Sequence, residues 1–200
     1  MRNERDGEAA NPGPQGIAEE EMKRGFANSE EDWSYDNDKG FVIAESINAT
    51  SFATNLEQIR ERRAHITLFQ EHAMTDEQIQ AVMLSLAMDG WNMLAGPRDP
   101  EHARKSGGVG MQCMKPLRPM KMQPMSEDFK DAYKTGRVAA WWVDIAGANV
   151  LFVVIYGWTG GQKGNEAAGR TDDIFGIVRN ELCLQPKALT VIAGDIDGDT

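Results

Sequence analysis

The sequence has no long apolar run. Its longest hydrophobic stretch, Val150 to Tyr156, is far shorter than the ~20 residues that a membrane-spanning helix needs. The first residues, Met1 to Asp6, are charged and lack the apolar stretch of a secretory signal peptide. We therefore expect an intracellular protein, in the nucleus or the cytoplasm, with no membrane partner.

Cysteine and histidine are both scarce. The two cysteines, Cys113 and Cys183, lie too far apart in the sequence for a metal-ligand pair. They are predicted to be buried free thiols in a reducing compartment. Of the three histidines, His65 is predicted to be structural, His72 to lie on a surface turn, and His102 to lie in a solvated loop.

An excess of positive charge is also absent. The net charge is −10, and residues 1–40 hold 11 acidic and 5 basic side chains of the total. This balance argues against binding nucleic acid by charge alone. It leaves a nuclease possible, because a metal-binding carboxylate cluster is negative until its ion arrives. Residues 98–137, with nine basic and five acidic side chains, could meet a nucleic-acid backbone or form a solvated surface.

The composition changes along the chain. Residues 1–38 are acidic, poor in apolar side chains and without periodicity, which predicts a disordered acidic tail. Residues 39–200 are predicted to form one α/β (α+β) domain, because short apolar strands alternate there with amphipathic helices. We expect a mixed sheet, since hairpin-like strand pairs occur between the helices.

The expected elements follow from apolar runs, helical spacing and capping residues. Predicted strands cover Phe41 to Asn48, His65 to Phe69, Trp91 to Leu94, Gly107 to Met111, Arg137 to Asp144, Val150 to Tyr156 and Ala188 to Ala193, with the first and last buried. Predicted helices cover Thr54 to Arg63, Thr75 to Met88 and Thr171 to Leu184, and residues 115–134 are predicted to be irregular.

Polar side chains stand where the apolar strands end. They are Asn48, Glu71, Tyr156, Asp195 and Asp197. A strand end suits a ligand because the sheet fixes the backbone while the side chain leaves the core. Mg²⁺ prefers oxygen ligands and keeps several waters, so one or two carboxylates suffice. Two aspartates at alternate positions of an extended segment face the same side, where they could orient a water and help to hold the metal.

The order of these motifs resembles a known family. The first motifs are a strand ending in Asn48, a strand ending in Leu68-Phe69-Gln70-Glu71, and a strand that starts at Gly107-Gly108-Val109. They are followed by a strand ending in Tyr156-Gly157, a helix, and a strand ending in Gly194-Asp195-Ile196-Asp197. This order, from about Phe41 to the last residue, resembles the endonuclease/exonuclease/phosphatase superfamily. The segment Tyr156 to Gly160 favours a retrotransposon-type endonuclease within it, beside the apurinic type.

The resemblance implies a fold and a set of roles. The fold is a four-layer α/β/β/α sandwich with two mixed sheets, here with the C-terminal half missing. The implied activity is Mg²⁺-dependent hydrolysis (Mn²⁺ as the alternative ion) of a phosphodiester in nucleic acid, with DNA expected. Asn48 and Glu71 match the metal positions, Tyr156 the phosphate-contacting tyrosine, and Asp195 the aspartate that activates water. Asp197 stands where the family has asparagine.

Two departures limit the expected activity. Asp197 adds a negative charge near the phosphate in place of a donor amide, which would raise the demand for metal or weaken activity. The family's later Ser-Asp-His motif has no counterpart, so a weak or inactive hydrolase is expected from this chain.

Other interpretations stay open. An inositol-phosphate or sphingolipid phosphodiesterase is the alternative enzyme, and an inactive remnant or binding module is the alternative of another class. Asp195 to Asp199 also resembles the start of a calcium loop, but the closing glutamate of such a loop is absent.

Overall fold

The computed structural model describes residues 41–50, 52–53, 55–61, 64–98, 107–158 and 165–195. Apart from Phe41, these all belong to one unit, Val42–Thr200. The predicted tail at 1–38, His102 and Asp197 lie outside the described residues. Within that part of the chain, no helix is long and apolar enough to cross a membrane.

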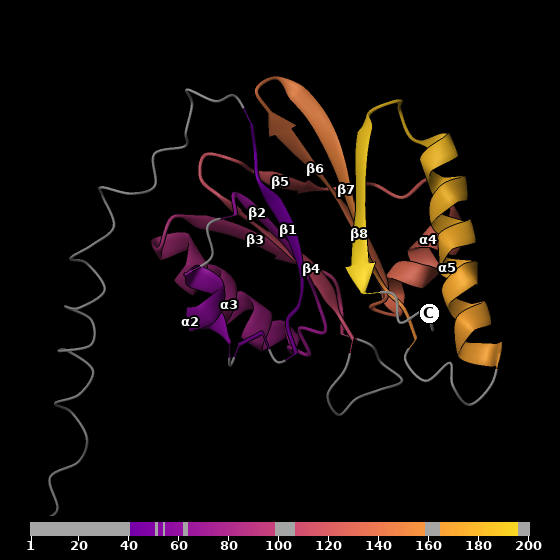
Figure 1. Ribbon diagram of the computed structural model, residues 1–200, viewed down its shortest axis with the longest axis horizontal. Coiled ribbons are helices and arrows are strands. Elements are labelled where there is room, and N and C mark those ends of the chain that lie inside the picture. Colours follow the sequence, from indigo (N-terminus) through magenta and orange to yellow (C-terminus); the bar gives the residue numbers. More distant parts are fainter. Residues whose placement is uncertain are drawn as a thin grey trace, which may run out of the picture. The chain divides into compact units, whose positions relative to one another are not determined.

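The first half of the described chain forms a four-stranded mixed sheet. Its order is β1 (Ala44–Asn48), β2 (Ile66–Gln70), β4 (Val109–Met114) and β3 (Trp91–Ala95), with β1 parallel to β2 and the other pairs antiparallel. Two helices, α2 (Leu56–Arg60) and α3 (Asp76–Met88), belong to this half (Figure 1). The predicted start of α3 is confirmed, because Thr75 and Gln78 form a reciprocal capping box.

The second half forms another four-stranded mixed sheet, with order β5-β6-β7-β8. The strands are β5 (Pro119–Lys121), β6 (Val138–Ile145), β7 (Ala148–Tyr156) and β8 (Leu189–Asp195), and the helices are α4 (Glu127–Lys134) and α5 (Asn165–Leu184). Strands β6 and β7 form the predicted hairpin, and Ala146 and Gly147 turn it with φ of +53° and +86°. Strands β7 and β8 are parallel, so each sheet carries one parallel pair.

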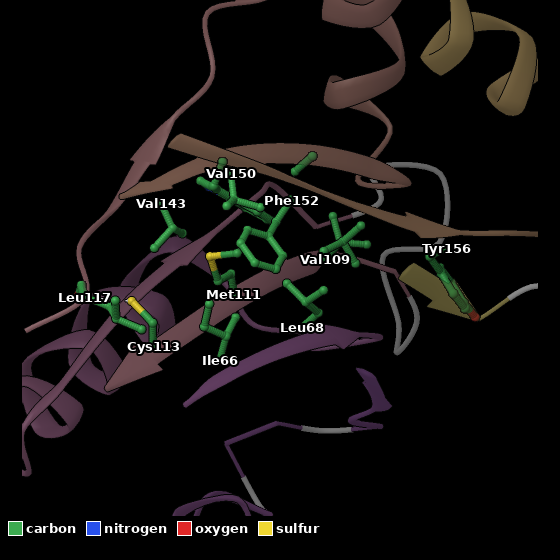
Figure 2. Packing of buried hydrophobic residues seen from close by; sticks show 13 residues of the cluster. Ile66, Leu68, Val109, Met111, Cys113, Leu117, Val143, Val150, Phe152 and Tyr156 are labelled. Atoms are coloured by element: carbon green, nitrogen blue, oxygen red, sulfur yellow. Dashed lines mark hydrogen bonds between the residues drawn. The ribbon is translucent and has the colours of Figure 1, made fainter. Parts of the chain in front are cut away.

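Three apolar clusters separate four layers of secondary structure. The central cluster, which Figure 2 shows, fills the space between the sheets with side chains such as Leu68, Met111 and Phe152. A second cluster joins α2 and α3 to the first sheet, and a third joins α4 and α5 to the second. The alternation along β7 serves both of its faces: Val150, Phe152 and Val154 point between the sheets, whereas Leu151 and Val153 point at the helices. The expected α/β/β/α sandwich is confirmed.

Three predictions about elements were wrong. The first and last strands are not buried: β1 alternates exposed and half-buried residues, and on β8 the side chain of Leu189 is 69% exposed. Both strands pair with only one neighbour among the described residues, which explains their exposure. Residues 115–134 are not irregular either, since they contain β5 and α4. Ser126 caps α4 by accepting the Phe129 amide, and Phe129 and Ala132 supply its buried face.

A buried carboxylate fixes the start of α4. Glu181 of α5 has no exposed surface and accepts the backbone N–H groups of Met125 and Ser126, the Ser126 hydroxyl and the Gln185 amide at 2.6–2.9 Å. Burial opposes ionisation of Glu181, but these hydrogen bonds together outweigh it and lower its pKa. Helix α4 is thereby tied to α5.

We expect Glu181→Gln to destabilise the protein by about 2 kcal/mol, because the amide leaves buried donors unpaired. Urea denaturation measures this, with Glu166→Gln, an 80%-plus exposed position on the same helix, as the control that should change little. The folded-state pKa of Glu181 lies below its unfolded value. The difference between wild type and variant should therefore be full above the unfolded pKa and fade as the pH falls through the folded pKa. Equal stabilities at neutral pH would contradict this role.

The two thiols differ in accessibility. Cys113 is buried, and burial raises its pKa to about 12, whereas Cys183 is exposed, so the prediction of two buried thiols was wrong for Cys183. We expect a disulfide reagent at pH 8 to modify one thiol in the native protein and both in urea, because only a thiolate reacts. Loss of the native reaction in Cys183→Ser would identify the site. Rapid modification of two native thiols would contradict the burial of Cys113.

Candidate active site

Four of the predicted site residues stand at the carboxyl ends of the two parallel strand pairs. Asn48 ends β1, and Glu71 directly follows β2, which pairs with β1. Tyr156 ends β7 and Asp195 ends β8, and these two residues are register partners. Strands β1 and β2 contact β7 and β8 across the sandwich, so the four strand ends meet at one end of it (Figure 1).

Two hydrogen bonds join the sheets at this end. The Asn48 amide Nδ2 donates to Asp195 Oδ2 at 2.7 Å. The Tyr156 hydroxyl donates to Glu71 Oε1. Figure 2 shows Tyr156 at one end of the central cluster, where its ring belongs to the core and its hydroxyl reaches the strand ends. The structure therefore brings Asn48, Glu71, Tyr156 and Asp195 together, while Asp197 lies outside the described residues.

Thr50 is a fifth member of this group that sequence reasoning missed. Its hydroxyl lies 3.0 Å from Asn48 Oδ1 and 2.8 Å from Glu71 Oε2, and its backbone N–H donates to Asn48 Oδ1 at 3.2 Å. These contacts fix the Asn48 amide with its nitrogen toward Asp195. The only sequence signal was the position of Thr50 two residues after a strand-end asparagine.

The oxygens of Asn48, Thr50 and Glu71 fit a small divalent cation. Thr50 holds Asn48 Oδ1 and Glu71 Oε2 close together through hydrogen bonds of 3.0 and 2.8 Å. In the part of the chain that the structure describes, no three His, Cys, Asp or Glu side chains gather as a metal site. The donors here are one carboxylate with an amide and a hydroxyl, a set that suits Mg²⁺ and does not suit a soft metal.

Tyr156 is held by a buried arginine. The Arg137 guanidinium lies 4.5 Å from the centre of the Tyr156 ring and 5.0 Å from that of Trp158, and its Nη1 donates to the Gly157 carbonyl at 2.8 Å. Burial, followed by the hydrogen bond to Glu71, raises the pKa of Tyr156 above its usual value, against a smaller opposing effect of Arg137. The phenol therefore stays protonated at neutral pH and acts as a donor.

Backbone contacts align the ends of β7 and β8. The Gly157 N–H donates to the Asp195 carbonyl at 3.0 Å. The Trp158 N–H donates to the Thr171 hydroxyl at 3.1 Å, which ties the segment after β7 to α5. Arg137 and Trp158 were not predicted as parts of the site, because their role is visible only from these contacts.

His72 was predicted to lie on a surface turn, and this was wrong. Its side chain is 1% exposed and its ring is hydrogen-bonded at both nitrogens, to the Met74 N–H and the Gly96 carbonyl. Burial lowers the pKa of His72 to about 4, against a weaker opposing effect of the Gly96 hydrogen bond. The imidazole is therefore neutral at physiological pH. His65, predicted to be structural, is buried and accepts the Ile43 N–H at Nδ1.

Known proteins match this chain in structure. No family model and no curated protein matches the sequence. Solved structures do match, among them a 3′-5′ exonuclease (NExo) from Neisseria meningitidis, with a TM-score of 0.55, 17% identity, and coverage of 77% of this chain and 57% of that one. The AP endonuclease LMAP from Leishmania major gives a TM-score of 0.56 at 14% identity, over 88% of this chain and 62% of that one. The chain has the endonuclease/exonuclease/phosphatase fold.

The solved structures that match are longer than this chain. A humanized TDP2 from D. rerio gives a TM-score of 0.51 at 13% identity, over 77% of this chain and 61% of that chain. The chain thus spans about three fifths of the length of these three endonuclease/exonuclease/phosphatase structures. At such identities the likeness establishes the fold, and the chemistry has to be argued from the geometry of the strand ends.

Proposed function

We propose that the strand-end site is the active site of a divalent-metal-dependent phosphodiester hydrolase that acts on nucleic acid. We expect this chain to hydrolyse its substrate slowly. The observation that supports this most is the convergence of Asn48, Glu71, Tyr156 and Asp195, two residues from each sheet, joined by the hydrogen bonds Asn48–Asp195 and Tyr156–Glu71. Four of the five residues that the family resemblance implies are therefore neighbours in space.

Asn48, Thr50 and Glu71 are the residues that would hold the cation, which is Mg²⁺ or Mn²⁺ by its oxygen ligands. When bound, the ion offsets charge on the phosphate. Asp195 accepts the Asn48 amide at Oδ2, which leaves Oδ1 to take the proton of an attacking water. The water oxygen then bonds to phosphorus while the ester P–O bond breaks, and the leaving oxygen takes a proton from solvent. Tyr156, held protonated, would exchange its hydrogen bond to Glu71 for one to a phosphate oxygen of the bound substrate.

The structural neighbours favour nucleic acid as the substrate. They are named as nucleases and related enzymes, and NExo was solved bound to a product DNA hairpin. Asp197 stands where the resemblance implies asparagine, and this departure in the sequence is the reason that we expect slow turnover.

The test combines metal titration with three substrates. Mn²⁺ is titrated by calorimetry, and the loaded protein is then assayed against abasic-site DNA, plain duplex DNA and an inositol phosphate. We expect saturable binding of one ion and slow, metal-dependent cleavage of DNA in preference to the inositol phosphate.

The outcomes separate the alternatives. Preference for the inositol phosphate would favour the phosphodiesterase of that class. Ion binding with no cleavage of any substrate would favour a binding module derived from the same fold. Absence of saturable Mn²⁺ binding would contradict the proposed function itself.

A further inference from the structure

The turn that carries Glu71 is strained. Glu71 and Ala73 both adopt left-handed backbone, with φ of +57° and +52°. A residue with a side chain costs of order 1 kcal/mol or more in this region, so two such residues separated by one position need a compensating interaction. In the left-handed geometry, Glu71 turns its carboxylate toward Thr50 and Tyr156.

The residue between them supplies that interaction. The Nδ1 atom of His72 accepts the Met74 N–H at 3.1 Å, and Nε2 lies 3.2 Å from the Gly96 carbonyl oxygen. A single neutral tautomer, with the proton on Nε2, satisfies both contacts. The ring also meets the edge of Phe69, at 6.1 Å between centroids. His72 is therefore fixed from the start of α3, from the end of β3 and from the core.

Two glycines before β4, Gly107 and Gly108, contact this turn. The backbone N–H groups of His72 and Ala73 donate to the carbonyls of Gly108 and Gly107 at 3.3 and 3.1 Å. Both glycines have φ of +87°, and a Cβ at Gly108 would lie 2.3 Å from Nε2 of His72. The Gly107-Gly108 step before β4 thus makes the space that the imidazole fills.

We propose that His72 is the positioning residue that locks the Glu71 turn and so places the Glu71 carboxylate at the site. Its metal-binding consequence rests on the proposed function; its effect on the Glu71–Tyr156 hydrogen bond does not. Because its ring is buried and both nitrogens are engaged within the protein, His72 acts through Glu71 and does not touch a substrate. Without the ring, the two left-handed residues lose their compensation and the carboxylate leaves Thr50 and Tyr156.

His65 provides a matched control. It is another buried histidine, it accepts a backbone N–H through Nδ1 at 3.0 Å, and it stands at the opposite end of β2 from Glu71. Replacing either histidine with alanine removes buried contacts. Only the replacement of His72 should alter the position of the Glu71 carboxylate.

The experiment measures two properties in His72→Ala and His65→Ala at a fixed pH. The first is Mn²⁺ affinity by calorimetry, and the second is the NMR signal of the Tyr156 ring carbon that bears the hydroxyl, assigned with Tyr156→Phe. We expect His72→Ala to weaken Mn²⁺ binding at least about tenfold, as the loss of a ligand-orienting partner does, and to shift the Tyr156 signal. His65→Ala should lower the melting temperature while leaving the affinity and the signal unchanged.

A conservative variant covers the case in which His72→Ala does not fold. His72→Gln can keep a donor to the Gly96 carbonyl, and it should retain more Mn²⁺ affinity than the alanine variant or, where that one is unfolded, show a smaller but measurable loss with a shifted Tyr156 signal. An unchanged Tyr156 signal and affinity in a folded His72 variant, or equal changes in both histidine variants, would overturn the proposal. If the wild type binds no Mn²⁺, the proposed function fails alone, since the Tyr156 signal still reports on the Glu71 turn.

Discussion

Glu71→Gln is expected to weaken Mn²⁺ binding on the order of 100-fold, or ~2.7 kcal/mol. The substitution removes the one carboxylate among the three proposed oxygen ligands, and it puts an amide nitrogen within reach of the position that the ion would take. Any metal-dependent hydrolysis should fall at least in proportion. Calorimetric titration of Mn²⁺ into the wild type and the variant measures the change directly.

The matched control is Glu127→Gln. Glu127 is 80% exposed on α4, where it pairs with Lys130, and the same chemical change there should leave Mn²⁺ affinity within twofold. Equal affinity of the wild type and Glu71→Gln would contradict the assignment of Glu71. A comparable loss in both variants would instead indicate that general surface charge attracts the ion.

Gly194→Ala is expected to destabilise the fold by about 3 kcal/mol or more, with a fall in melting temperature of about 10 °C. A Cβ at Gly194 would lie 2.1 Å from the Ile155 carbonyl oxygen and 2.9 Å from its carbon. Both atoms are backbone of the neighbouring strand β7, so no side chain can move aside. Strand β8 must separate from β7, and the Asp195 carbonyl then loses the Gly157 N–H.

Gly169→Ala is the matched control for this prediction. Gly169 lies within α5, and nothing stands within 4 Å of a Cβ there. Alanine favours helix over glycine by up to ~1 kcal/mol, so this variant should be slightly more stable than the wild type. Thermal unfolding followed by circular dichroism compares the three proteins. A Gly194→Ala protein as stable as the wild type would show that β7 and β8 are not packed as described.

Local sequence signals predicted the central elements well. The apolar run Val150 to Tyr156 predicted β7 because both faces of that strand are buried, and the Thr75 cap predicted the start of α3. The signals failed where tertiary position decides. The residues of a strand do not determine whether it lies at the edge of a sheet. The apolar residues near β1 and in β8 therefore led to the wrong expectation that both strands are buried. Helix α4 was missed although Ser126, two acidic residues and Lys134 mark its ends, because the surrounding prolines and methionines suggested a loop.

The site was predictable to the extent that strand ends determine it. The order of the motifs led to Asn48, Glu71, Tyr156 and Asp195, and parallel pairing in each sheet brings those ends together. Thr50 and Arg137 were beyond sequence reasoning, since the contacts of Thr50 with Glu71 and of Arg137 with Tyr156 and Gly157 join residues about 20 positions apart. His72 was misplaced for a related reason. The left-handed backbone at Glu71 and Ala73 turns the His72 ring into the core, and neither residue type predicts that conformation.

We propose above that one divalent cation binds among the oxygens of Asn48, Thr50 and Glu71, facing Tyr156 and Asp195. The most direct test is a crystal structure of the chain with Mn²⁺, in which anomalous scattering locates the ion independently of any assumed chemistry. We expect a single strong anomalous peak within about 2.4 Å of a Glu71 carboxylate oxygen and close to the Asn48 side chain. A peak at some other surface carboxylate, with Glu71 still bonded to Tyr156 and no density among these oxygens, would contradict it.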